Sequence, residues 1–168
     1  MPLRAACSLI VAAALAVSLD AGQGTFAVPA SAPRAPWFAT WQLVQPAAAG
    51  RFESPAYKRV TLRIEPWEDG LRVVYDMVRT RGGITHMEWA GQFDGRDYPV
   101  QGADYVLTNA YRRIDDRSYE IAIKVDGRSV ATATAVVSTN GSTLTVTTRE
   151  RDASGGAVTT TAVYKRIT

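Results

Sequence analysis

Seven aromatic and methionine side chains are the residues of this sequence whose types and spacing best suit the binding of another molecule. They fall on the apolar positions of segments in which apolar and polar residues alternate, so they share one face of each predicted strand. These residues are Tyr75, Met77, Met87, Trp89, Tyr111, Tyr119 and Tyr164. Such side chains adapt to apolar ligands, and tyrosine adds a hydroxyl group that can hydrogen-bond. The set predicts either a site for an apolar or amphipathic molecule or an ordinary packed core.

The later part of the chain is predicted to form a second wall opposite these large residues. The threonines expected on its inward phase are Thr132, Thr134, Thr148 and Thr160. They would make that wall smaller and mildly polar. One bulky apolar wall and one small polar wall together predict a slot for a flat or elongated amphipathic molecule.

His86 is the one histidine of the sequence and the first candidate for catalysis. It shares its phase with Glu88 and lies opposite Met87 and Trp89, which predicts that it faces water. A general base needs an orienting partner and a nucleophile within reach, and no motif supplies them. The sequence therefore predicts no catalytic residue and a protein that is not an enzyme. A cofactor-independent isomerase or cyclase on a barrel scaffold is the alternative.

Two pairs of aspartates could offer carboxylates to a calcium ion. They are Asp94 with Asp97 and Asp115 with Asp116. Turns use aspartate for local backbone hydrogen bonds, and neither spacing matches a known calcium loop. We therefore expect no metal site and no cofactor.

Composition narrows the function further. The chain has 168 residues, which favours one domain, and its net charge of +3 is too mild to predict nucleic-acid binding. The basic cluster of Arg112, Arg113 and Arg117 is interpreted as a solvated face. The single cysteine, Cys7, excludes a disulfide framework and any zinc site built on cysteines.

The N-terminal segment is typical of a signal peptide. Arg4 precedes an apolar run over 5–17, which is shorter than the roughly 20 residues that a membrane-spanning helix needs. We assign the signal peptide to 1–21 and leave its cleavage site open between 18 and 30. The protein is then exported, to the periplasm or outside the cell, without stable insertion into a membrane.

The rest of the chain divides into a leader and a domain. Small residues and proline fill 22–36, which predicts a flexible leader. From 37 to 168 apolar and polar residues alternate between Asp-Gly and Asn-Gly turn signals, which predicts antiparallel strands and a single domain. Nine strands are expected, near 38–45, 57–65, 71–79, 84–93, 104–114, 118–125, 128–138, 143–151 and 157–166.

Short connections between consecutive strands indicate an up-and-down meander. An open meander of this length would leave two exposed edges, and closure into a barrel removes them. The predicted fold is all-β, an antiparallel meander of about nine strands closed into a barrel. Such a barrel has an interior large enough for side chains or for one small ligand.

Several segments also resemble known barrel families. The opening 38–43 resembles the Gly-x-Trp strand of lipocalins and fatty-acid-binding proteins, the calycin group, and 161–166 is similar to the last strand of fatty-acid-binding proteins. Other segments resemble small exported bacterial lipocalin-like proteins, mostly uncharacterised, over roughly 38–166. These segments are 91–100, 112–115, 137–147 and 163–164. The resemblance implies a lipocalin-like barrel and no settled activity.

The departures from these families limit what the resemblance implies. Ala39 stands where lipocalins place glycine, and 45–56 is too short for the helical pair of fatty-acid-binding proteins. The Arg-x-Tyr of their last strand, which grips a ligand carboxylate, is replaced here by Ala162-Val163-Tyr164. A carboxylate site copied from that family is therefore not supported.

Two hypotheses of different classes follow. In one, the exported barrel is a monomer that holds a small apolar or amphipathic ligand. In the other, side chains fill the barrel, and its loops contact another exported protein. In both, Trp41 is expected to plug one end of the barrel, covered by Arg166 or Lys165.

Overall fold

The computed structural model describes residues 34–45, 57–152 and 154–168. The predicted signal peptide and its cleavage site lie outside the described residues, as does most of the predicted leader. Residues 34–36 of that leader are described, and Ala35 packs against the core of the domain. Among the described residues, no helix is both long and apolar enough to cross a membrane.

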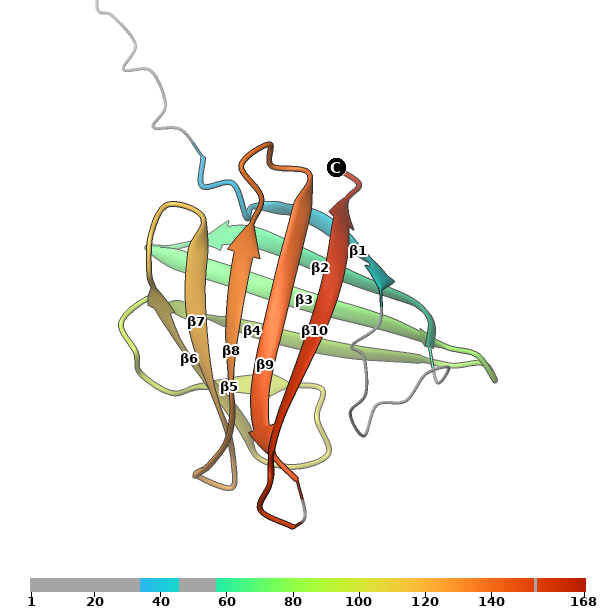
Figure 1. Cartoon of the computed structure of the whole chain (residues 1–168), viewed down its shortest axis with the longest axis vertical. Helices are drawn as coiled ribbons and strands as arrows, with labels where there is room; N and C mark the ends of the chain where they lie inside the picture. The colour runs from blue at the N-terminus through green and yellow to red at the C-terminus, as the bar shows by residue number, and fades with distance from the viewer. Residues whose placement is uncertain (1–33, 46–56, 153) are drawn as a thin grey trace, which may run out of the picture. The chain divides into compact units, whose positions relative to one another are not determined.

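The described chain forms a closed antiparallel barrel of ten strands (Figure 1). The strands are β1 (Ala39–Gln45), β2 (Tyr57–Trp67), β3 (Gly70–Arg79), β4 (Ile84–Gln92), β5 (Tyr98–Gln101), β6 (Leu107–Arg113), β7 (Ser118–Val125), β8 (Arg128–Val137), β9 (Thr143–Arg151) and β10 (Ala157–Arg166). Each strand pairs with its neighbours in sequence, and β1 also pairs with β10. The prediction of an all-β meander closed into a barrel is confirmed.

The expected strand number of nine is one too low, because β5, which lies between the expected strands 84–93 and 104–114, was not predicted. β5 has four residues, one of them Pro99, and only two of its residues pair with each neighbouring strand. A segment this short cannot display a period of two, and proline is unfavourable in strands.

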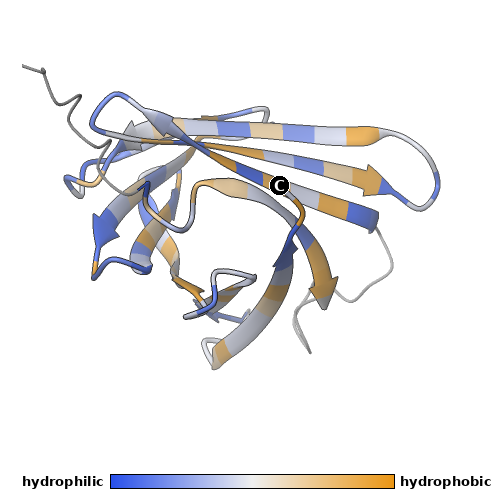
Figure 2. Ribbon diagram, turned by 90° about the horizontal axis from the view of Figure 1, so that it is seen from above, coloured by the Kyte–Doolittle hydropathy of each residue, from blue (hydrophilic) through white to orange (hydrophobic). Residues whose placement is uncertain are grey.

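Alternation along the strands separates an inner face from an outer face. In β2, Val60, Leu62 and Ile64 are buried, whereas Arg59 and Arg63 are exposed. Figure 2 shows the same alternation of apolar and polar residues along the other long strands. The inner faces line the barrel interior.

One predicted turn glycine serves a different purpose. The turn between β2 and β3 takes its positive φ of 47° at Glu68, and Gly70 is already the first residue of β3. A Cβ atom at Gly70 would lie 2.0 Å from the backbone oxygen of Gly91 on β4. Glycine is needed here because the two backbones approach so closely.

Candidate ligand site in the barrel interior

Aromatic rings fill the end of the barrel at which β6, β8 and β10 finish, called here the closed end. The Trp37 ring lies 5.5 Å from the Tyr119 ring and 5.7 Å from the Phe93 ring. Trp89 stacks on Tyr111 with ring centroids 3.9 Å apart. The rings are in direct contact, so this half of the barrel is a packed core.

Trp41 completes the closed end from β1. Its side chain is fully buried, and its indole nitrogen donates a hydrogen bond of 3.0 Å to the backbone oxygen of Trp37. The guanidinium of Arg166 lies 4.8 Å from the Trp41 ring centroid, and that of Arg113 lies 5.5 Å from the Trp37 ring. Arg166, and not Lys165, therefore covers Trp41. Stacking of this kind is attractive because the ring faces are negative.

Three of the predicted ligand-binding residues belong to this packed core. Trp89, Tyr111 and Tyr119 are at most 2% exposed. Trp89 stacks on Tyr111, and Tyr111 stacks on Tyr119. Their role in ligand binding stays a prediction.

Towards the opposite end, called here the open end, the inward residues are less tightly packed. Tyr75, Met77 and Met87 are only half-buried, although their strand phase directs them inward. Burial raises the pKa of Tyr75, and yet the residue is only half-buried. Tyr75 is therefore less completely packed than Trp89 and Tyr111, which are at most 2% exposed.

Small residues form the wall across from Tyr75. Ala133 and Ala135 of β8 are buried there, and Thr148 pairs with Ala133 across β8 and β9. Thr148 and Thr160 are half-buried and pair with each other across β9 and β10. These side chains are too short to reach far into the barrel, so the bulky and the small wall expected from the sequence both exist.

The expected inward phase of β8 is wrong. Thr132 and Thr134 point outward, because the buried residues of β8 are Ala133, Ala135 and Val137. Threonine and alanine alternate along β8 and differ little in hydropathy, so the sequence does not show which of them faces inward. The inward face of β8 is set by the strands with which it pairs. Ala133, which pairs with the buried Ile121 of β7, sets that phase.

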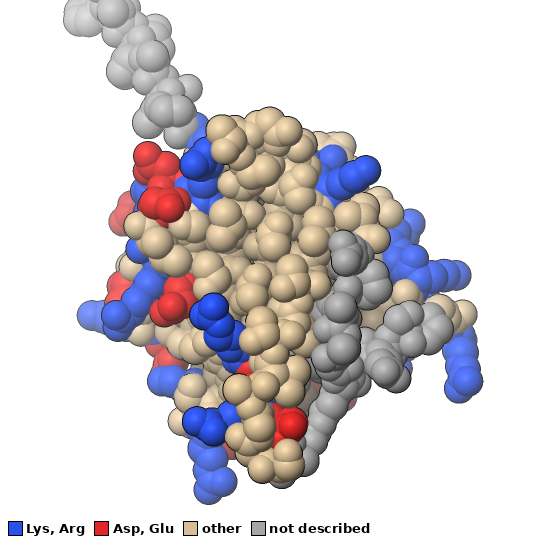
Figure 3. All heavy atoms as spheres, viewed as in Figure 1, with Lys and Arg blue, Asp and Glu red and all other residues tan. Residues whose placement is uncertain are grey.

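The outward threonines instead form part of an uncharged surface. Thr134, Thr147 and Thr161 lie opposite one another across β8, β9 and β10. Figure 3 shows uncharged residues over the upper part of this face. Cross-strand threonine pairs stabilise sheets. Sheet stability therefore explains this row of threonines, and no ligand is needed to explain it.

Burial raises the pKa of each interior tyrosine because the charged phenolate loses its hydration. The pKa of Tyr75 rises to about 12 from this cause alone. The pKa values of Tyr111, Tyr119 and Tyr164 also lie well above the usual value of 10, first through burial and then through the nearby Tyr75. All four hydroxyl groups therefore stay protonated and neutral at physiological pH.

Charged residues that share the inward phase lie only at the two ends of the described strands. Arg113 and Arg166 cover the tryptophans at the closed end. Arg79 ends β3, and Glu150 lies next to the end of β9, both at the open end. Glu150 also lines a surface hollow between β8 and the start of β10. The described midsection between them is uncharged.

Asn109 is an interior residue that the sequence reasoning missed. It lies on the inward phase of β6 beside Tyr111, and its side chain lowers the pKa of the Tyr111 hydroxyl, against the larger effect of burial. Its Oδ1 is sealed from water without a partner, and its backbone oxygen accepts a 3.1 Å hydrogen bond from Trp89 Nε1. The sequence did contain a signal for Asn109: it lies two positions before Tyr111, so the two residues share the inward face of the strand.

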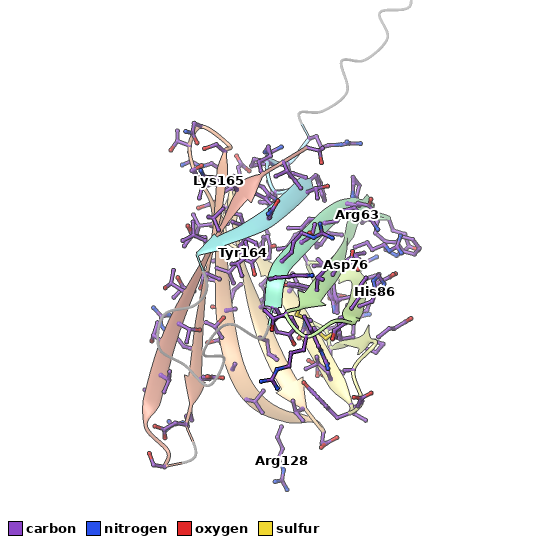
Figure 4. The ribbon with its side chains drawn as sticks, turned by 90° about the vertical axis from the view of Figure 1, so that its right-hand side faces the viewer. Arg63, Asp76, His86, Arg128, Tyr164 and Lys165 are labelled. Carbon is purple, nitrogen blue, oxygen red and sulfur yellow. The ribbon has the colours of Figure 1, made fainter. Side chains whose placement is uncertain are left out.

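His86 lies on the outer surface, as predicted, and has an orienting partner that the sequence did not reveal. Its Nδ1 is 2.7 Å from Asp76 Oδ1, and the two residues pair across β3 and β4 (Figure 4). Beside them, Arg72 donates two hydrogen bonds of 2.7 and 2.6 Å to Glu88, and these lower the pKa of that carboxyl. The histidine is on the face opposite to the interior, so it takes no part in a barrel site.

The predicted turn aspartates are engaged in local hydrogen bonds. Asp94 Oδ1 accepts from the backbone of Arg96 at 2.9 Å, and Asp115 Oδ1 accepts from the backbone of Arg117 at 2.7 Å. These two contacts are the turn-stabilising role that aspartate ordinarily has. Asp97 instead forms an ion pair of 2.6 Å with Lys124 of β7, which is distant in sequence.

Comparisons with known proteins find likeness only among solved structures. No protein-family model and no curated protein matches the chain. A solved structure described as "The Siderocalin Ex-FABP functions through dual ligand specificities" is similar over 78% of this chain and 70% of that chain. Its sequence identity is 16% and its TM-score is 0.38, so this likeness carries no argument about function.

The strand order defines the fold. A single antiparallel meander that closes on its first and last strands is an up-and-down barrel, an architecture that lipocalins share with other proteins. The interior of this barrel has a packed aromatic half and a half in which Tyr75, Met77 and Met87 are only partly buried.

Proposed function

We propose that this protein is an exported binding protein that holds a small apolar or amphipathic molecule in the open-end half of its barrel. The observation that carries the proposal is the incomplete burial of Tyr75, which follows the inward phase of β3 and packs against the core while remaining only half-buried. Met77 and Met87 lie on the same wall. Trp89 and Tyr111 contribute the floor of the site, together with Tyr119, and Tyr164 borders it from β10.

Two further observations support this proposal. The apolar run at 5–17 has the length of a signal-peptide core, which supports export. Ile84 starts β4, and Tyr105 and Val106 precede β6, so these apolar side chains lie at the open end, where they are 56–68% exposed. Exposed apolar residues around an opening favour the approach of an apolar molecule.

Filling the interior from the small wall should abolish binding. In Ala162→Phe, the new ring occupies the space opposite Tyr75, and we expect the affinity for the uncharged dye Nile red to fall at least about tenfold. Thr161→Phe is the matched control, because Thr161 is the preceding residue and faces outward. Nile red fluorescence measures binding, and a thermal melt of each variant checks that it folds.

Retained dye binding in Ala162→Phe would place the site elsewhere. If the unaltered protein binds no dye, and native mass spectrometry of protein from its host repeatedly finds no co-purifying molecule, the binding function is excluded. The barrel would then be a filled one that acts through its surface.

A further inference from the structure

The rim of the barrel at its open end carries more cations than anions. The strand ends and turns that meet there place seven exposed cationic side chains around the opening. They are Lys58, Arg59, Arg79, Arg81, Arg128, Arg149 and Arg151. The described acidic residues of the same end are Asp104, Asp126, Glu150 and Asp152. This set of residues, called here the open-end rim, is therefore net positive.

The rim cations are not neutralised by neighbouring carboxylates. None of the seven forms an ion pair with another described residue, whereas Arg113 at the closed end pairs with Asp116. The rest of the chain holds two acidic residues, Asp20 and Glu53, which are too few to balance seven cations. Unbalanced like charges on one side of a protein attract an anionic surface.

An exposed apolar residue lies among the cations at the β3–β4 turn. Ile84 is 68% exposed and pairs with Val78, which pairs on its other side with Arg59. Arg79 follows Val78 directly, and Arg81 lies in the turn. Ile84 is thus surrounded by cationic neighbours and has no apolar cover.

The same combination recurs at the β7–β8 turn. Val106 is 63% exposed, and its backbone oxygen accepts a 2.9 Å hydrogen bond from the backbone of Asp126. This contact holds the apolar Tyr105 and Val106 beside the turn that carries Arg128. Aliphatic and cationic side chains therefore alternate around the opening.

A surface hollow between β8 and β10 extends this pattern along the rim. Arg149 and Arg151 line it together with Val130, which is 43% exposed. Glu150 also lines the hollow, so its charge is only partly balanced. Cations beside apolar side chains are the combination that binds the interface of an anionic bilayer.

We propose that the open-end rim docks on the surface of a lipid bilayer that contains anionic lipids. The cations attract the lipid phosphates, and Ile84, Tyr105 and Val106 enter the headgroup layer without crossing the membrane. The exposed aliphatic residues favour a bilayer over a soluble acidic partner, which would satisfy the cations alone. This inference concerns the outer rim and does not rest on the proposed interior site.

Vesicle sedimentation measures the docking. Protein purified from its host is mixed with vesicles of phosphatidylcholine, alone or with an equal part of phosphatidylglycerol, at about 0.1 M salt. We expect binding to the anionic vesicles to be at least about tenfold tighter than to the neutral ones. At about 1 M salt, where the screening length falls to about 3 Å, this difference should disappear.

Removal of rim cations tests the position of the docking surface. In the triple variant Arg79→Gln, Arg81→Gln and Arg128→Gln, affinity for the anionic vesicles should fall at least about tenfold. The reason is that one basic residue near such a surface contributes about fivefold. A thermal melt checks that the variant folds.

The matched control removes the same charge from the opposite end. Arg34→Gln, Arg117→Gln and Lys165→Gln change exposed residues of the closed end and should leave vesicle binding within about twofold. Figure 4 shows Arg128 and Lys165 at opposite ends of the barrel. An equal loss of binding in the two triple variants would overturn the inference, because net charge alone would then explain it.

Substitution of the apolar residues separates a bilayer from a soluble polyanion. Ile84→Ser and Val106→Ser should each weaken binding to the anionic vesicles about 3- to 10-fold. Ile114→Ser, at a residue that is 56% exposed at the closed end, is the control and should change nothing. Unchanged binding in both rim variants would contradict contact with the headgroup layer.

Two further results would overturn the inference. One is equal binding to neutral and anionic vesicles. The other is binding of soluble polyglutamate as tightly as the anionic vesicles, which would assign the rim to an acidic protein. Absence of vesicle binding by protein that still binds Nile red would overturn this inference and leave the proposed function intact.

Discussion

Between pH 10 and pH 12 the barrel is expected to lose most of its stability. Four interior tyrosines are protonated in the folded state, and their pKa values are raised above the value of about 10 that applies in the unfolded chain. These residues are Tyr75, Tyr111, Tyr119 and Tyr164. As the pH rises above 10, the unfolded chain releases these protons while the folded barrel retains them. The unfolded state is therefore favoured progressively.

The size of this effect follows from the pKa shifts. The contribution of Tyr75, whose pKa is about 12, is fully present below pH 10 and is lost as the pH rises to 12. A shift of two units corresponds to about 3 kcal/mol. The other three tyrosines act in the same direction, and a domain has only about 5–15 kcal/mol in total.

Urea unfolding measured at a series of pH values from 8 to about 12 checks this expectation. Tyr75→Phe lacks one titrating group, so its unfolding free energy should fall less steeply above pH 10 than that of the unaltered protein. Tyr105→Phe is the comparison in an exposed loop. Parallel curves for Tyr75→Phe and the unaltered protein would contradict the interior position of the Tyr75 hydroxyl.

Replacement of Trp41 by alanine is expected to be the most damaging single substitution at the closed end. Its side chain is fully buried, hydrogen-bonded to the Trp37 backbone and covered by Arg166. Truncation of such a residue leaves a cavity and typically costs about 3–5 kcal/mol. Arg166→Met should cost less, about 1–2 kcal/mol, because it leaves the core intact and removes the cation–ring attraction together with the hydrogen bonds from Arg166 to the backbone oxygens of Gly141 and Pro36.

Chemical denaturation measures both losses. Trp67→Ala is the matched control, because Trp67 is 46% exposed at the end of β2 and its truncation should change stability by less than about 0.5 kcal/mol. A melting temperature of Trp41→Ala within a few degrees of the unaltered protein would show that Trp41 does not hold the closed end together.

The sequence by itself determined the all-β class, the meander and the inward phase of most strands. These features depend on local signals: alternation in segments such as 60–64, and Asp-Gly or Asn-Gly turns such as that at 126–127, where both residues have positive φ. The water-facing position of His86 follows from the same alternation. β5 was not predicted because its four residues, which include Pro99, are too few to show a period of two.

Only the tertiary structure decided which inward residues fill the barrel and which border open space. Trp89, Tyr111 and Tyr75 share one sequence pattern, but the first two stack face to face and the third stays accessible, because ring packing depends on partners from other strands. The phase of β8 likewise depended on its pairing with β7. Closure of the barrel brings inward residues of β3, β7 and β10 into one core, and no local signal relates strands that are far apart in the chain.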